Sequence, residues 1–468
     1  MAITATYMMP HPPIMVPEIG KGEEKKIEKT VKACQDIAKE IKEIKPDTII
    51  IMSPHAPSYS DYFNISYGEK GEGDFGNFLV PELKYEKEYD FQFIEKLVDI
   101  AMHMEFPAGV LGDQDHDLDH GALVPLYFIE KEYTDYKLVH IALSGLPMED
   151  HYKLGILIKE VAAVTGKNTV FIASGDLSHR TKKEGPYGFN PAGPKYDKKI
   201  MKVMGNGDFE KLFKVKDGEL ENAAVCGHKS FVTMAGTLDR RNVSAEALSY
   251  EDEFGVGYGV CKYRPGDKNP QRNFVDQEDS RKRRFITEER KHEDPWMKLA
   301  RETIEKYIKY DVKIPEPANI PREMSMEKAG VFVSLKQRGQ LRGCIGTIRP
   351  AHKNIACEIM ENAILAATSD LRFDPVTEKD LYTLSYSVDV LGKPEPIDSI
   401  EQLDPENYGV IVTEKDKMGV LLPNLEGIDT AEKQISIACA KGGISPNSKN
   451  LKMERFKVTR HAYMEYDE

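Results

Sequence analysis

Three apolar runs alternate with helical patterns in the first half of the chain, and this alternation constrains the fold most strongly. The runs cover 48–52, 138–143 and 169–173, and each is apolar almost throughout, as in strands of a parallel sheet that is covered on both faces. Amphipathic helical patterns cover 25–44 and about 151–164. The pattern predicts a three-layer α/β domain, with a central sheet flanked by helices.

The length requires more than this one domain. At 468 residues the chain exceeds the roughly 250–300 residues at which a single hydrophobic core stops growing. Mixed charge and few apolar residues mark a boundary, so we assign residues 1–264 to the first domain, 265–294 to a linker and 295–468 to the second domain. The second domain has helical patterns at its start and at 354–367 but no regular strand–helix alternation, which predicts an α+β fold.

Composition indicates which classes of partner the protein binds and in which cellular compartment it is found. The net charge of −13 is spread along the chain, which argues against a nucleic-acid-binding face and favours small molecules or proteins as partners. There is no apolar run of about 18 residues and no signal-like N-terminus, so we expect a cytoplasmic protein with no membrane span. The six cysteines form no CxxC pair, which argues against disulfides and structural zinc.

Four histidines lie in loops that follow predicted strands or adjoin Gly and Pro. They are His11, His55, His120 and His179. One such histidine alone is usually just exposed, but four at repeated strand ends predict a metal or acid–base site, because imidazole serves both purposes near pH 7. Residues 181–197 are rich in Gly, Pro, Lys and Tyr, and we expect them to form a surface loop, or lid, over this edge.

The motifs around these histidines resemble those of class III extradiol dioxygenases (LigB-like proteins) and the related Memo proteins. The resemblance covers residues 1–264 and rests on His11-Pro12-Pro13, Ser53-Pro54-His55, Asp119-His120-Gly121 and Gly175-Asp176-Leu177-Ser178-His179. It implies that His11 and His55, with a later carboxylate, bind non-haem Fe(II). The open positions would take a catechol and dioxygen. By the same resemblance His179 is the acid–base group, and His120 orients the substrate or stabilises charge.

The third ligand departs from the ring-cleaving pattern. Where those enzymes supply glutamate, residues 223–228 read Ala-Ala-Val-Cys-Gly-His, which resembles the Cys-Gly of Memo proteins. We therefore expect Cys226 as the third ligand, with Glu221 as the alternative. A free cysteine before a helix is also a common buried core residue. A thiolate favours Fe(II), Cu(I) or Zn(II), so Fe(II) is the expected cofactor and copper or zinc the alternatives.

Asp176, His228 and the remaining histidines are not expected to bind the metal. Asp176 either orients His179 by a hydrogen bond or caps a helix. His228 either lines the pocket or is exposed. The other histidines have no convergent partners in the sequence and are expected to be structural: His103, His116, His140, His151, His292, His352 and His461.

The second domain resembles the AMMECR-type domain. The resemblance rests on Leu341–Thr347 (LRGCIGT), on Ala366–Val376 and on Gly419–Pro423. Arg342 beside Cys344 would lower the pKa of that thiol and bind an anion, making a second site. In the other interpretation Cys344 packs in the core and Arg342 pairs with an acid such as Asp370.

The two resemblances together define the functional hypotheses. The combination resembles proteins of the AmmeMemoRadiSam group, which implies a radical-SAM protein partner. The leading hypothesis is an Fe(II)-dependent oxygenase that acts with dioxygen on a catechol or related phenolic molecule. The alternatives are a Memo-like metal-binding protein for redox handling or recognition, and a scaffold that binds an anionic peptide or nucleotide. A homo-oligomer is compatible with the sequence.

Overall fold

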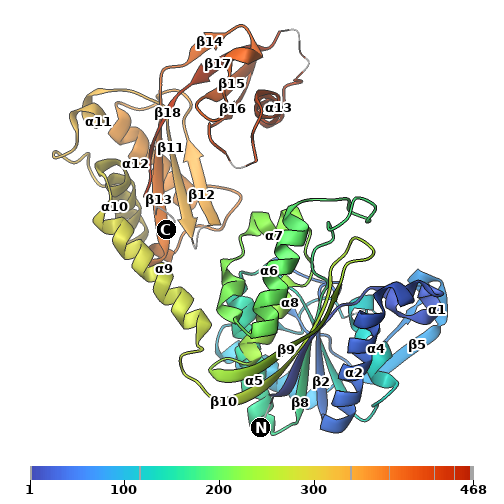
Figure 1. The fold of residues 1–468 in the computed structure, drawn as a ribbon. Coiled ribbons are helices and arrows are strands. Elements are labelled where there is room, and N and C mark those ends of the chain that lie inside the picture. The colour runs from blue at the N-terminus through green and yellow to red at the C-terminus, as the bar shows by residue number, and fades with distance from the viewer. Residues whose placement is uncertain are drawn as a thin grey trace. The chain divides into compact units, whose positions relative to one another are not determined.

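The chain forms two compact units in the computed structural model, which describes residues 3–463 apart from 115–116, 338–339, 379, 426, 447 and 449. The units are Met1–Glu278 and Asp279–Glu468. Their division falls within helix α9 (Phe274–Lys291), so much of the segment expected as a linker is helical (Figure 1). His116 lies outside the described residues.

The first unit is built on a six-stranded sheet of order β7-β2-β8-β1-β10-β9. The first four strands in this order are parallel, and β10 and β9 extend the sheet in antiparallel pairing. The strands are β1 (Ile3–Met9), β2 (Thr48–Ser53), β7 (Lys137–Ala142), β8 (Thr169–Ser174), β9 (Arg241–Glu251) and β10 (Tyr258–Lys268). Each of the three apolar runs therefore forms a parallel strand, as predicted.

Helices cover both faces of this sheet, which confirms the three-layer α/β fold (Figure 1). The helix α2 buries Cys34, Ile37 and Ile41, the apolar stripe that the sequence pattern places toward a core. One face carries α2 (Glu28–Ile44) and α4 (His120–Glu130); the other carries α3 (Phe91–His103), α5 (Met148–Thr165), α6 (Ala192–Asn206), α7 (Asp217–Ala223) and α8 (His228–Thr237). The short elements are α1 (Pro17–Gly20), β3 (Phe63–Asn64), β4 (Lys70–Phe75), β5 (Val80–Glu88) and β6 (Ala108–Gly109).

The loop expected over 181–197 is shorter than predicted, because α6 begins at Ala192. Pro194 lies in the first helical turn, where a missing N–H costs no hydrogen bond. The side chain of Asn190 accepts a hydrogen bond from the backbone N–H of Ala192 (2.9 Å). Prolines that suggested a loop therefore start a helix here.

The second unit contains two four-stranded antiparallel sheets and confirms the α+β prediction. Their orders are β12-β11-β13-β18 and β14-β17-β15-β16. Helices α10 and α12 cover one face of the first sheet, and α13 packs on the second sheet. The elements are α10 (Pro295–Tyr310), α11 (Arg322–Met326), β11 (Val331–Gln337), β12 (Gln340–Gly346), α12 (Ile355–Thr368), β13 (Leu384–Leu391), β14 (Glu395–Ile397), β15 (Gly409–Glu414), β16 (Lys417–Leu421), α13 (Ala431–Gly442), β17 (Lys452–Phe456) and β18 (Val458–His461).

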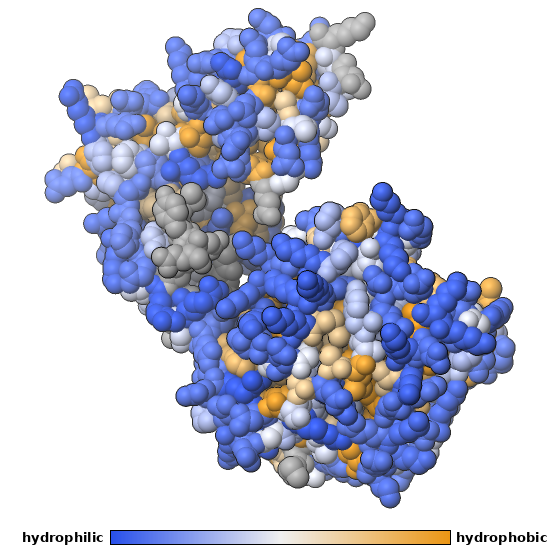
Figure 2. All heavy atoms as spheres, viewed as in Figure 1, coloured by the Kyte–Doolittle hydropathy of each residue, from blue (hydrophilic) through white to orange (hydrophobic). Residues whose placement is uncertain are grey.

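The surface is largely polar. Hydrophilic side chains cover most of the visible face of each unit (Figure 2). Among the described residues, no helix has the length and apolar character needed to cross a membrane.

Candidate metal centre

The predicted site residues follow the carboxyl ends of neighbouring parallel strands. His11 lies two residues after β1, His55 two residues after β2, and Asp176 two residues after β8. The order β2-β8-β1 places these three strand ends side by side. Loops at this edge of an α/β sheet are the usual place for ligand binding.

Three side chains converge on one point: His11, His55 and Cys226 offer ligand atoms that all lie within 4.8 Å of one another. The two Nε2 atoms are 3.0 Å apart, and the Cys226 Sγ is 3.8 Å from the His11 Nε2. Two nitrogens that each bind an ion at about 2.1 Å lie about 3.0–3.4 Å apart at angles of about 90–110°. A thiolate at about 2.3 Å lies about 3.6–3.8 Å from such a nitrogen at about 110–120°. These two separations are therefore compatible with ligands of a single metal ion.

A close contact between two glycines places Cys226 at the end of β8. A Cβ atom on Gly175 would lie 2.2 Å from the Cα of Gly227, so only glycine allows this approach. The Cys226 Sγ then accepts a hydrogen bond from the backbone N–H of Asp176 (3.2 Å). Glu221, the alternative third ligand, is exposed on α7 and is not part of the convergent group.

The second ring nitrogen of His11 fixes the tautomer of that ring. The Ser174 hydroxyl donates its hydrogen to the Gly121 carbonyl oxygen (2.5 Å). Its oxygen must therefore accept the Nδ1–H of His11, 2.8 Å away. The lone pair of the neutral ring is then on Nε2, the atom that faces His55 and Cys226. Ser174 thus orients the ligand, as hydrogen-bond partners of metal-binding histidines commonly do.

Asp119 and His140 support the loop that carries His55, a role that sequence reasoning missed. One Asp119 carboxylate oxygen accepts from the Ser53 hydroxyl (2.5 Å) and from the N–H of Gly121 (2.7 Å). The other lies 3.2 Å from the Nε2 of His140. Burial opposes ionisation of Asp119, but the hydrogen bond and charge of His140 hold its pKa below the usual range. The Ser53 hydroxyl in turn accepts the backbone N–H of His55 (3.2 Å).

His120 and His179 lie beside the convergent group. The His120 ring centre is 4.1 Å from that of His55 and 5.4 Å from that of His11. The Nδ1 of His179 donates to the Ala224 carbonyl oxygen (2.6 Å), so the lone pair of the neutral ring is on Nε2, available to take a proton. The charge of His179 is close enough to affect the pKa of His11.

Burial sets the protonation states of these groups. It lowers the pKa of His11 far below its ordinary value and that of His120 to about 4. It also lowers the pKa values of His55 and His179, so the imidazoles are neutral near pH 7, as ligands and bases must be. Burial raises the pKa of the Cys226 thiol well above its ordinary value.

Metal affinity should therefore rise with pH. The ligand histidines are already neutral, but Cys226 must lose its proton to bind, so we expect about a tenfold gain in affinity per pH unit between about pH 6 and 8. Chelator competition measures this slope. In Cys226→Ala, the slope of log affinity against pH should be smaller by about one. Asp176 accepts the backbone N–H of His11 (3.0 Å) instead of bonding His179 or capping a helix. Burial raises its pKa to about 7, so its ionisation contributes to the pH dependence in both proteins. Equal slopes in the two proteins would exclude thiolate binding.

His228 lies neither in the pocket nor in solvent, contrary to both expectations. It is the first residue of α8, is buried, and its pKa is lowered by burial to about 4. Its Nδ1 bonds the Tyr196 hydroxyl (2.9 Å) and its Nε2 the Leu212 carbonyl oxygen (3.1 Å). Both ring nitrogens of His228 therefore join α8 to α6 and to the segment that follows α6.

The residues expected at a second site are separated in the structure. Arg342 donates to the backbone oxygens of Asp374 (2.5 Å) and Pro375 (3.3 Å), and it forms an ion pair with Asp380 (3.7 Å), so it pairs with an acid as one interpretation expected. Asp370 pairs with Arg372 instead, and also accepts the backbone N–H of Cys344 (2.9 Å). A register shift between Leu335 and Lys336 leaves Arg342 out of the strand pairing, so it does not share the face of Cys344.

Comparison with known proteins identifies both units. The family model described as the catalytic LigB subunit of aromatic ring-opening dioxygenase matches residues 5–261, more than half of the 468 residues. The chain belongs to the LigB family. A second model, AMMECR1, matches residues 297–461, so this LigB protein also carries an AMMECR1 domain.

One relative of this LigB protein matches along its whole length, and two other similar proteins match about a third of it. Protein CA_C1420 of Clostridium acetobutylicum is 43% identical over 470 residues, covering 98% of this chain and 99% of its own length. A Thermotoga maritima protein is 45% identical over 170 residues, which are 36% of this chain and 98% of that protein. The crystal structure of PH0010 from Pyrococcus horikoshii shares 30% identity over 35% of this chain and 88% of its own, with a TM-score of 0.34.

Proposed function

We propose that the LigB-type domain is an Fe(II)-dependent oxygenase that acts on a catechol or a related phenolic molecule. The observation that supports this most is the convergence of His11, His55 and Cys226, with ligand atoms within 4.8 Å. Three protein ligands leave positions on the ion open for a substrate. The neutral rings of His120 and His179 lie beside the ligand histidines.

Each side chain has a part in this proposal. His11, His55 and Cys226 would hold the ion, and Fe(II) there would supply the electron transfer that couples an electron-rich phenolic ring to dioxygen. His179 takes the phenolic proton on Nε2, because its Nδ1–H is held by the Ala224 carbonyl oxygen. His120 orients the substrate and stabilises negative charge that develops on it.

A second candidate function is favoured by the thiol itself. Cys226 stands where ring-cleaving relatives are expected to use a carboxylate, and a softer donor suits copper or zinc as well as iron. In this alternative the domain is a Memo-like metal-binding protein for redox handling or recognition. It works without ring cleavage. In either case we propose cytoplasmic action with a radical-SAM protein partner, and a substrate-binding or partner-binding role for the AMMECR1 domain.

Oxygen uptake distinguishes the two candidates. The full chain is purified without oxygen, loaded with Fe(II), and mixed with dioxygen and a panel of catechols. We expect oxygen consumption and a yellow ring-opened product that contains both oxygen atoms of dioxygen. His55→Ala should abolish both, and Glu221→Ala, a change on the exposed face of α7, should leave them unchanged. A fully loaded protein that gives neither signal with any catechol would exclude ring cleavage.

A further inference from the structure

The first sheet of the second unit has one apolar face and one polar face. On β11, Val331, Val333 and Leu335 are fully buried in the core that α10 and α12 complete. Side chains alternate along a strand, so Ser334 and Lys336 lie on the opposite face. This face is distinct from the candidate metal centre, which lies in the other unit.

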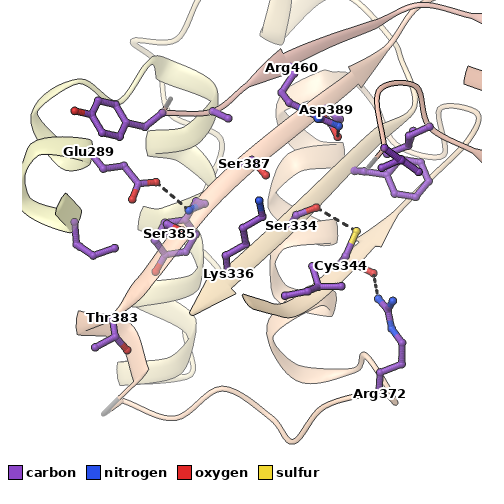
Figure 3. A pocket seen from close by; sticks show the side chains of 18 of the residues that line it. Glu289, Ser334, Lys336, Cys344, Arg372, Thr383, Ser385, Ser387, Asp389 and Arg460 are labelled. Carbon is purple, nitrogen blue, oxygen red and sulfur yellow. Dashed lines mark hydrogen bonds and ion pairs between the residues drawn. The ribbon is translucent and has the colours of Figure 1, made fainter. Parts of the chain in front are cut away.

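The strand register gathers polar groups on that face. Ser334 pairs with Cys344 on β12 and with Ser387 on β13. The next row pairs Lys336 with Ser385. The Ser334 hydroxyl donates to the Cys344 Sγ (3.2 Å), and Figure 3 shows the Lys336 side chain in the middle of the group. Three hydroxyls, a thiol and an ammonium group therefore share one surface.

This surface is the floor of a cavity of about 810 Å³. Residues from β16 and the segment after it form an apolar wall, which includes Val420, Leu422 and Leu425. Ile286 and Glu289 of α9 form another part of the lining. Large cavities with apolar walls and a few convergent polar groups are typical of small-molecule sites.

Glu289 supplies a buried carboxylate, one oxygen of which has no hydrogen-bond partner among the described residues. Its side chain is only 3% exposed. One carboxylate oxygen accepts the backbone N–H of Tyr386 (3.3 Å), but the other has no hydrogen-bond partner among the described residues. Burial raises the Glu289 pKa to about 7. Buried polar atoms are almost always hydrogen-bonded, so this oxygen indicates a ligand that brings a donor.

Lys336 supplies an available cation. Two arginines in the lining are already neutralised: Arg460 pairs with Asp389 through two contacts (2.8 and 3.0 Å), and Arg372 pairs with Asp370 (2.7 Å). The Lys336 ammonium has no ion pair or hydrogen bond with the described part of the chain, and its charge acts on the buried Glu289, whose pKa it lowers. This ammonium group can therefore bind an oxyanion of a ligand.

We propose that this cavity binds a small organic anion with an apolar body. Lys336, Ser385 and Ser387 hold its carboxylate or phosphate group, and Val420 and Leu422 contact its body. A hydroxyl or ammonium group of the ligand donates to Glu289. The ligand then covers the Cys344 thiol. This site is independent of the metal centre, so the outcome of its test does not bear on the proposed oxygenase activity.

Cys344 reports on the site directly. In the full chain, its modification by the aromatic anion dithiobis(nitrobenzoate) and by neutral dithiodipyridine is followed by peptide mass spectrometry. Cys357, half-buried on α12, is the internal control. Lys336→Met should slow the anionic reagent at Cys344 by about fivefold and leave the neutral reagent unchanged. Lys336→Arg keeps the charge and should react at the wild-type rate, which excludes misfolding as the cause. Lys393→Met, a change at an exposed lysine, should have no effect.

Protection experiments test ligand binding itself. Para-hydroxyphenylacetate and phenyl phosphate, the carboxylate and phosphate probes, should slow modification of Cys344 by the neutral reagent, and whichever protects at lower concentration identifies the anion. Neutral para-hydroxyphenylacetamide should protect more weakly. The advantage of para-hydroxyphenylacetate over phenylacetate should vanish in Glu289→Gln. If neither anion protects Cys344, or if both protect Lys336→Met as well as the wild type, the proposal is wrong.

Discussion

His55→Ala is expected to lower the affinity of the protein for its metal ion by about a thousandfold. Loss of a hydrogen-bond partner outside the ligand set commonly costs about 10–100-fold, and loss of a direct ligand costs more. Cys226→Ala should have a similar effect, because its Sγ is the third convergent atom. Competition with a coloured chelator measures both affinities, under anaerobic conditions for Fe(II).

Two control variants make this result specific. Glu221→Ala removes an exposed carboxylate near Cys226 in sequence, and His103→Ala removes an exposed histidine whose Nδ1 bonds the backbone oxygen of Asp99. Both should bind metal like the wild type. Equal metal occupancy in His55→Ala, Cys226→Ala and the wild type would remove the oxygenase and the Memo-like function together.

His179→Gln is expected to lower kcat for oxygen-dependent turnover by about 10²–10⁴-fold, the usual contribution of a positioned general acid or base. The glutamine keeps a hydrogen-bonding group but cannot take a proton near pH 7. Metal affinity should change by less than about threefold, because His179 is not in the convergent group. Stopped-flow product formation on the Fe(II)-loaded protein measures kcat.

The contact between Tyr187 and His179 provides the comparison for this variant. The Tyr187 ring packs edge-on against His179 with ring centres 5.2 Å apart. Tyr187→Phe keeps that ring and should retain most of kcat. If His179→Gln turns over at the wild-type rate, the proton acceptor must be another group, and the role assigned to His179 is incorrect.

Local patterns in the sequence were sufficient for the architecture. The apolar runs that form β2, β7 and β8 are recognisable because buried parallel strands are apolar on both faces. His11 and His55 could be expected at one sheet edge because each follows such a strand. Cys226 required the resemblance to Memo proteins, since its position depends on the contact between Gly175 and Gly227, which no local pattern reveals.

Other features depend on contacts between residues far apart in sequence. His140 lies within an apolar strand and is structural, as predicted, but only the fold shows that its Nε2 lies 3.2 Å from the Asp119 carboxylate. Arg342 and Cys344 are two residues apart and would share a face in a regular strand, but the register shift opposite Leu335 separates them. The polar face of β11 can be predicted from the alternation of polar and apolar residues along the strand. The buried Glu289 of the same cavity cannot, because it comes from helix α9.

X-ray absorption at the metal edge tests the central claim most directly. The full chain is loaded with Fe(II), or with Zn(II) as a redox-silent control, and compared with Cys226→Ala. We predict one sulfur scatterer at about 2.3 Å and two imidazole nitrogens at about 2.1 Å in the wild type, with the sulfur absent in the variant. A wild-type spectrum with only nitrogen and oxygen scatterers would contradict the assignment of Cys226 and return the site to a carboxylate-type ligand set.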